Sequence, residues 1–147
     1  MPLRERAQEF DDIFDFRLAV ESAAARLAAE RRTEQEVRLL QEAIHSMKRA
    51  TDRHSFRKVD SEFHLGVAEA GRNTLLKETI ELARAAMFLP IDALDYEVAR
   101  ETSIRQHLRV LRSIQLKEAK NAERAMAAHI ESTRAELHKI LSDPELE

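Results

Sequence analysis

The chain of 147 residues contains no cysteine, only two glycines and only three prolines. The lack of cysteine excludes disulfides, thiolate metal sites and thiol nucleophiles. Glycine and proline are the residues least compatible with a helix interior, whereas alanine, leucine, glutamate and arginine, which dominate here, are strong helix formers. We therefore expect a nearly all-α fold, in a chain long enough to form one domain without covalent staples.

The sequence also lacks an excess of charge of one sign and any long apolar run. Charged residues make up 35% of the chain, but the two signs are interspersed and leave a net charge of −3. This pattern is typical of solvated helix faces and disfavours nucleic-acid binding by this chain alone. No segment approaches the roughly 18 apolar residues that span a bilayer, and the start of the chain lacks the apolar stretch of a signal peptide. We expect a soluble, cytoplasmic protein without a membrane partner.

The spacing of apolar residues predicts an antiparallel bundle of about six helices, with no second domain. Residues 1–10 are expected to be a tail or linker remnant, and residues 11–147 a single helical domain. The expected helices run from 11 or 12 to 31, from Thr33 past Met47, over 56–70, from Asn73 to a bend or end near Leu89, over 96–116, and from 119 to about 141.

Local signals set several of these boundaries. Thr33 and Glu36 have the spacing of a capping box, and Asn73 is a natural N-cap. Gly71 is a natural C-terminal stop, and Pro90 lacks the backbone donor that a helix interior needs. Residues 52–55 are predicted to form a short polar joint before the third helix.

Asp60 and His64 are the most informative pair of residues. Because they are four positions apart, they differ by only about 40° around a helix axis and leave the same face. His107 and His129 lie in the apolar stripes of two later helices. One carboxylate oxygen and three imidazole nitrogens suit a borderline divalent cation such as Zn²⁺ or Ni²⁺. A single buried histidine is more often just hydrogen-bonded, and the set of four favours a metal only slightly over a metal-free Asp–His network.

Other chemistries find little support in the sequence. No Glu-x-x-His or His-Glu-x-x-His motif and no Gly-rich phosphate loop is present, which argues against di-iron, zincin and nucleotide sites. The remaining histidines, His45, His54 and His138, are expected at the surface or in joints. A metal-dependent hydrolase or lyase remains an alternative, because a metal-bound water can act as nucleophile. Glu62, however, is two residues from both Asp60 and His64, and so is turned away from their face.

Five segments carry a family resemblance. They are Phe16-Arg17-Leu18-Ala19-Val20-Glu21 with Ala24-Ala25-Arg26-Leu27-Ala28-Ala29-Glu30; Asp60-Ser61-Glu62-Phe63-His64; Gly71-Arg72-Asn73-Thr74-Leu75-Leu76; Gln106-His107-Leu108-Arg109-Val110-Leu111; and Ala125-Met126-Ala127-Ala128-His129-Ile130. Together they resemble the C-terminal effector-binding domain of FadR-type regulators in the GntR superfamily, called the FCD domain.

The resemblance implies an all-α domain that holds a divalent metal, Zn²⁺ or Ni²⁺, through Asp60, His64, His107 and His129. It implies a small organic acid as effector, a homodimer, and DNA binding only through a winged helix-turn-helix domain that this chain lacks. The implied function is ligand sensing and dimerisation in a transcriptional regulator, not catalysis. Arg17 matches a family arginine that could hold the carboxylate, while its alternative role is an exposed ion pair with Glu21, four residues on.

The sequence departs from the family pattern in three places. Gln106 stands where an acidic residue often precedes the histidine, Arg72 replaces a small residue, and Lys117-Glu118 replaces a Gly-Asp turn. These changes fall on turns and on neighbours of the expected ligands. They leave the four ligands intact but put the identity of the effector in doubt.

Overall fold

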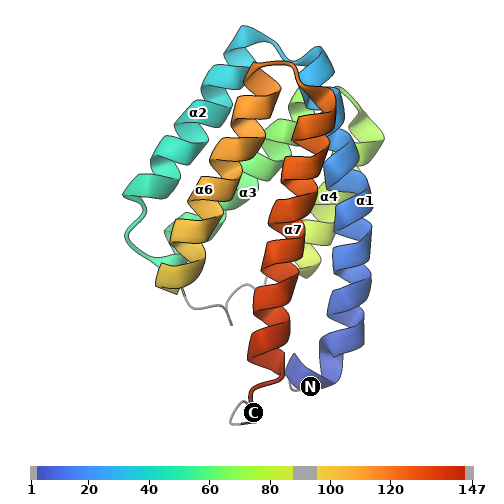
Figure 1. Ribbon diagram of the computed structural model, residues 1–147, viewed down its shortest axis with the longest axis vertical. Coiled ribbons are helices and arrows are strands. Elements are labelled where there is room, and N and C mark those ends of the chain that lie inside the picture. Colours follow the sequence, from blue (N-terminus) through green and yellow to red (C-terminus); the bar gives the residue numbers. More distant parts are fainter. Residues whose placement is uncertain (1–2, 88–95, 145–147) are drawn as a thin grey trace.

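A computed structural model describes residues 3–87 and 96–144, and every regular element in these ranges is a helix (Figure 1). The elements are η1 (Leu3–Arg6), α1 (Ala7–Arg31), α2 (Glu34–Arg49), α3 (Arg53–Ala70), α4 (Thr74–Ala86), α6 (Tyr96–Gln115) and α7 (Ala119–Leu141). The all-α prediction is confirmed. No helix in the described ranges is long and apolar enough to cross a membrane.

The helices pack along their lengths around a main apolar core, and a smaller apolar cluster of Ala24, Ala68 and Ile80 lies between α1, α3 and α4. Helix α1 packs against α7, α3 and α4, and α6 packs against α7 and α2. In Figure 1, α1 and α7 run in opposite directions, so the two ends of the chain lie at the same end of the bundle. The core is filled by large apolar side chains that are at most 1% exposed, among them Phe14, Phe63, Met47, Met126 and Leu137. Such burial is the main source of stability for helices that would be marginal in isolation.

Two helices begin earlier than the sequence suggested. Helix α1 starts at Ala7, inside the expected tail or linker, because Phe10 is only 1% exposed and extends the buried stripe that Phe14 continues. Helix α3 starts at Arg53, so the expected polar joint is in fact its first turn. The side chain of Asp52 accepts a hydrogen bond from the Ser55 amide at 2.7 Å, which satisfies one of the free amides of that turn. The capping box of Thr33 and Glu36 forms as expected.

Gly71 ends α3 for a different reason from the one expected. Its φ is −74°, and the left-handed residue is Arg72, with φ of 56°. A side chain at Gly71 would place Cβ 3.1 Å from the carbonyl oxygen of Ala24 and 3.3 Å from Cβ of Leu27. Gly71 therefore lets the end of α3 approach α1 closely. The expected break near Leu89 and Pro90 lies outside the described residues.

Candidate metal centre

The four predicted ligands come together although they lie on three helices. Asp60 and His64 belong to α3, His107 to α6 and His129 to α7, and one potential ligand atom from each lies within 4.8 Å of the others. The three histidines are 0–4% exposed, and the side chain of Asp60 is 14% exposed. The convergence expected from the sequence is thus present in the fold, while metal ligation itself stays a prediction.

Each of the three imidazoles directs its Nδ1 atom to an oxygen that accepts a hydrogen bond. A neutral imidazole has one N–H, so an Nδ1–H donor leaves Nε2 with a free lone pair. The acceptors are Glu21 Oε1 for His64 at 2.5 Å, the Ser103 carbonyl for His107 at 2.5 Å, and Gln106 Oε1 for His129 at 2.6 Å. Such partners fix the tautomer and ring orientation of metal-binding histidines.

The Nε2 atoms of His64 and His107 are buried and have no hydrogen-bond partner. They lie 3.5 and 2.8 Å from the same atom, Oδ1 of Asp60. A lone pair that faces a carboxylate oxygen at these distances is unfavourable unless a positive species lies between them. Nitrogen and oxygen donors of this kind match Zn²⁺ and Ni²⁺, so the residues fit a divalent ion.

Burial and charge hold the ligands in the forms that bind metal. Burial lowers the pKa of His107, although Asp60 opposes this effect, and it lowers the pKa of His129 further, helped by the two neighbouring imidazoles. Burial raises the pKa of Asp60, but the Arg84 guanidinium, His64 and His107 outweigh it and hold this pKa well below its usual range. At neutral pH the cluster therefore has two neutral imidazoles and one carboxylate whose charge states are set by these surroundings.

Three further charged side chains support the cluster, and the sequence analysis assigned only one of them to the site. Arg17 Nε donates to Glu21 Oε2 at 2.6 Å, and both side chains are at most 3% exposed. The alternative of an exposed Arg17–Glu21 pair is therefore wrong in its exposure: the pair forms, but Glu21 also binds His64 and lies in the core. Arg84 Nη2 donates to Asp60 Oδ2 at 2.6 Å, which orients the carboxylate from its far side.

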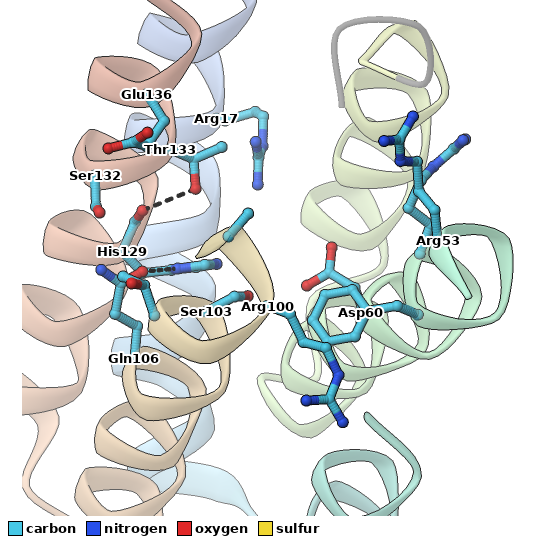
Figure 2. Close-up of a pocket in the computed structure, with 14 residues that line it drawn as sticks. Arg17, Arg53, Asp60, Arg100, Ser103, Gln106, His129, Ser132, Thr133 and Glu136 are labelled. Atoms are coloured by element: carbon cyan, nitrogen blue, oxygen red, sulfur yellow. Dashed lines mark hydrogen bonds between the residues drawn. The ribbon is translucent and has the colours of Figure 1, made fainter. Parts of the chain in front are cut away.

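A cavity of about 100 Å³ opens from the cluster toward the surface (Figure 2). Figure 2 shows Asp60 and Arg53 on the α3 wall, His129 and Thr133 on the opposite α7 wall, and Arg17 reaching in from α1. The cavity is lined by Arg17, Arg53, Phe56, Arg57, Asp60, Ala99, Arg100, Thr102, Ser103, Gln106, His129, Ser132, Thr133 and Glu136. It is smaller than the roughly 300–1,000 Å³ typical of pockets for drug-sized ligands, so it suits a small polar molecule.

The four candidate ligands lie within the part of the chain that a family model matches. The model of the FCD domain matches residues 12–132, which is most of the chain. The chain belongs to the FCD domain family. The segments that resembled this family run from Phe16 to Ile130, and all of them fall within the matched range.

Curated relatives of this FCD domain are transcriptional regulators of the GntR family. The HTH-type transcriptional repressor RspR of Escherichia coli is 28% identical over 128 residues, which are 84% of this chain and 56% of the relative. LutR of Bacillus subtilis, an HTH-type transcriptional regulator, is 26% identical over 132 residues, which are 85% of this chain and 60% of the relative. The chain thus spans just over half the length of the curated relatives that it matches.

Solved structures show the same fold. E. coli McbR/YncC aligns with a TM-score of 0.82 and 23% identity, over 90% of this chain and 69% of that one. Streptococcus agalactiae GntR aligns with a TM-score of 0.77 and 25% identity, over 89% of this chain and 59% of that one.

RspR and LutR are named as transcriptional regulators and not as enzymes. The hydrolase or lyase alternative loses its support. The position of Glu62 agrees with this conclusion, because its side chain is exposed to solvent and not turned into the cluster.

Proposed function

We propose that residues 11–147 form the effector-sensing domain of a GntR-family transcriptional regulator, and that the domain holds a divalent metal and a small carboxylate. The observation that carries the proposal is the meeting of three imidazoles and one carboxylate, with their other sides already hydrogen-bonded. Asp60, His64, His107 and His129 would hold the ion, with Zn²⁺ or Ni²⁺ as the best match. When bound, the ion supplies a fixed positive charge with coordination positions left for an anionic oxygen.

Arg17 contributes to the same cavity. Its guanidinium lines the cavity wall while Nε is held by Glu21, so its position is fixed before any ligand arrives. A guanidinium in a fixed position is well suited to a carboxylate, which it can bind through two parallel hydrogen bonds. We propose that Arg17 binds the effector carboxylate beside the metal.

Ligand binding would act on the packing of three helices. The candidate ligands come from α3, α6 and α7, so an effector on the metal contacts groups anchored on all of them. An effector shifts an equilibrium between two packings only by its difference in affinity for them. In the proposed regulator, this shift changes how a winged helix-turn-helix domain outside this chain is presented to DNA.

Native mass spectrometry tests the proposal. The purified chain, incubated with Zn²⁺ or Ni²⁺ and desalted, should carry the mass of a divalent ion, and acetate should add its mass only to the metal-bound form. A chain that takes up neither ion would overturn the metal site. A chain that takes up metal but shows no acetate adduct and no heat of acetate binding would overturn the carboxylate effector alone.

Metal affinity should depend on pH with a definite sign. Protons and metal compete for the imidazole nitrogens, so the affinity falls as the histidines become protonated. Because the pKa values of His107 and His129 are lowered, Zn²⁺ affinity should hold from about pH 8 to about pH 6.5 and weaken only at lower pH. Equilibrium dialysis against buffered Zn²⁺ measures this directly. A metal content that stays constant down to about pH 5 would contradict ligation by histidine.

We also propose that the domain forms a homodimer, as its family resemblance implies. On α4, Leu75 and Leu82 are 74% and 72% exposed and lie seven residues apart, so they share a face that a twofold axis could pair with itself. Leu82→Glu would bring two carboxylates together there and should give a monomer in sedimentation. Leu116→Glu, which changes a leucine that is 54% exposed at the end of α6, should leave the dimer intact. A monomeric parent would overturn the dimer, and a dimeric Leu82→Glu variant would overturn this face.

A further inference from the structure

Four buried charged side chains surround the cluster, and their charges sum to zero when no metal ion is bound. Asp60 and Glu21 contribute two negative charges, and each carboxylate accepts a hydrogen bond from a guanidinium. Arg84 and Arg17 are positive and lie 2.6 Å from Asp60 and Glu21, respectively. Two carboxylates and two guanidiniums thus sum to zero.

We call Asp60, Glu21, Arg17 and Arg84 the charged cage. A divalent ion bound beside this cage adds two positive charges that these buried groups do not compensate. The side chains of Glu21, Arg17, Arg84 and Asp60 are only 2–14% exposed, so water compensates little of that charge. An uncompensated buried charge costs several kcal/mol, even after relaxation of the protein. A ligand with one carboxylate neutralises half of the added charge, whereas a dianion neutralises all of it.

The cavity offers a place for a second anionic group at a distance from the first. Arg53 and Arg57 precede Asp60 and His64 on α3 with spacings of four, three and four residues, so all of them share one helix face. At 1.5 Å per residue, Arg57 and Arg53 lie about 4.5 and 10 Å along the axis from Asp60. Both arginines line the cavity, and Figure 2 shows Arg53 on the same wall as Asp60.

We infer that the effector is a short dicarboxylate, with one carboxylate on the metal beside Arg17 and the other facing Arg53 and Arg57. This inference rests on the proposed function and narrows its ligand from a carboxylate to a dianion with separated charges. The small volume of the cavity limits the spacer between the two carboxylates to a few carbon atoms. Thr133 lines the opposite wall, and its hydroxyl, which donates to the His129 carbonyl at 3.2 Å, can still accept a hydrogen bond from a polar substituent on that spacer.

Calorimetric titration of the Zn²⁺-loaded chain with succinate and with butyrate tests the inference. The two probes share a chain of four carbons and differ only in the second carboxylate. Succinate should bind at least about tenfold more tightly than butyrate, the effect expected of one additional charge-assisted contact.

In the Arg57→Gln and Arg53→Gln variants, the affinity for succinate should fall about tenfold while the affinity for butyrate stays unchanged. Arg53 is exposed, so its variant tests the site even where the change of buried Arg57 impairs folding. Arg109→Gln, at an exposed position of α6 outside the cavity, is the matched control and should bind both probes as the parent does.

Every other result of these titrations would overturn a specific part of the inference or of the proposed function. Metal content is measured first, and a parent without Zn²⁺ overturns the proposed function together with this inference. A Zn²⁺-loaded parent that binds succinate and butyrate equally overturns the dicarboxylate alone, whereas one that binds neither overturns the carboxylate effector of the proposed function as well. A Zn²⁺-loaded parent that binds inorganic phosphate more tightly than succinate overturns the separation of the two charges, because phosphate is a compact dianion. A loss of affinity shared by both probes in the Arg57→Gln and Arg53→Gln variants overturns the placement of the second carboxylate.

Discussion

Replacing His107 with alanine should abolish stoichiometric metal binding by the purified chain. His107 is fully buried, and its Nε2 atom lies 2.8 Å from Oδ1 of Asp60 with no hydrogen-bond partner. Loss of a residue that only supports a ligand typically costs about 10–100-fold in metal affinity, so loss of a ligand should cost more than about 100-fold. Elemental analysis after dialysis against buffered Zn²⁺ gives the metal content of the variant and of the parent.

The same substitution also creates a cavity, so its effect on folding has to be measured separately. Large-to-small changes in a core commonly cost about 2–5 kcal/mol, and circular dichroism shows whether the helices persist. His45→Ala is the matched control, because His45 lies on the exposed side of α2 and should keep the metal of the parent. His129→Ala repeats the test from α7. Equal metal in the parent and in a folded His107→Ala variant would show that the ligand assignment is wrong.

The convergence of the four candidate ligands was predictable because it depends on helix periodicity. Asp60 and His64 share a face whatever the surrounding fold, and the apolar stripes around His107 and His129 turn those side chains toward the core. The fold class followed from the same stripes and from the scarcity of helix breakers. The boundaries that were missed lie where a single side chain outweighs the polar character of its neighbours, as Asp52 does by capping α3 and Phe10 by entering the core.

The supporting residues were harder to predict because they depend on how the helices are rotated and offset against one another. Arg17 and Glu21 have the same spacing as an ordinary surface pair, and only the packing of α1 against its neighbouring helices buries them. Arg84 offered a usable signal, since it lies four residues after buried Ile80 and three before buried Met87, on the apolar stripe of α4. A charged residue on a buried stripe requires a partner, and here the partner is Asp60.

Gln106 shows how a departure from the family pattern can retain a function. An acidic residue at this position would accept a hydrogen bond from His129, and the amide oxygen of Gln106 accepts one at 2.6 Å. The glutamine therefore still directs the Nδ1 proton of His129 away from the cluster. It does so without adding a negative charge, so Asp60 and Glu21 supply the negative charges next to the cluster.

Replacing Glu21 with glutamine should destabilise the protein by about 3–5 kcal/mol, the usual cost of removing one member of a buried ion pair. Glu21 is 1% exposed and accepts hydrogen bonds from Arg17 at 2.6 Å and from His64 at 2.5 Å. Glutamine has nearly the same shape, so the loss is electrostatic and leaves the Arg17 guanidinium buried without its counter-charge. Urea denaturation at about pH 7, with and without Zn²⁺, gives the free energy of unfolding.

Helix α1 contains its own control for this measurement. Arg26 and Glu30 have the same four-residue spacing, but their side chains are 40% and 46% exposed and lie 3.5 Å apart. Glu30→Gln should therefore change the free energy of unfolding by less than about 1 kcal/mol, as for other exposed pairs. Residue type, spacing and helix are shared, so the two pairs differ in burial and in the contacts with His64 and Arg84 that the buried position gives Glu21. Equal effects of Glu21→Gln and Glu30→Gln would show that the buried pair is not formed in the folded protein.

The contribution of Glu21 should also disappear in acid. Although burial opposes ionisation, Arg17, the hydrogen-bonded imidazole of His64 and Arg84 together hold the pKa of folded Glu21 well below its usual range. A depressed folded pKa means that the stabilisation is fully present above the unfolded value of about 4.3 and is lost as the pH falls from there through the folded pKa. The difference in stability between the parent and Glu21→Gln should thus be constant above about pH 5.5 and shrink below about pH 4.3. A difference that grows on acidification would mean that Glu21 is protonated in the folded state, and the neutral cage around the metal site would then carry one positive charge more.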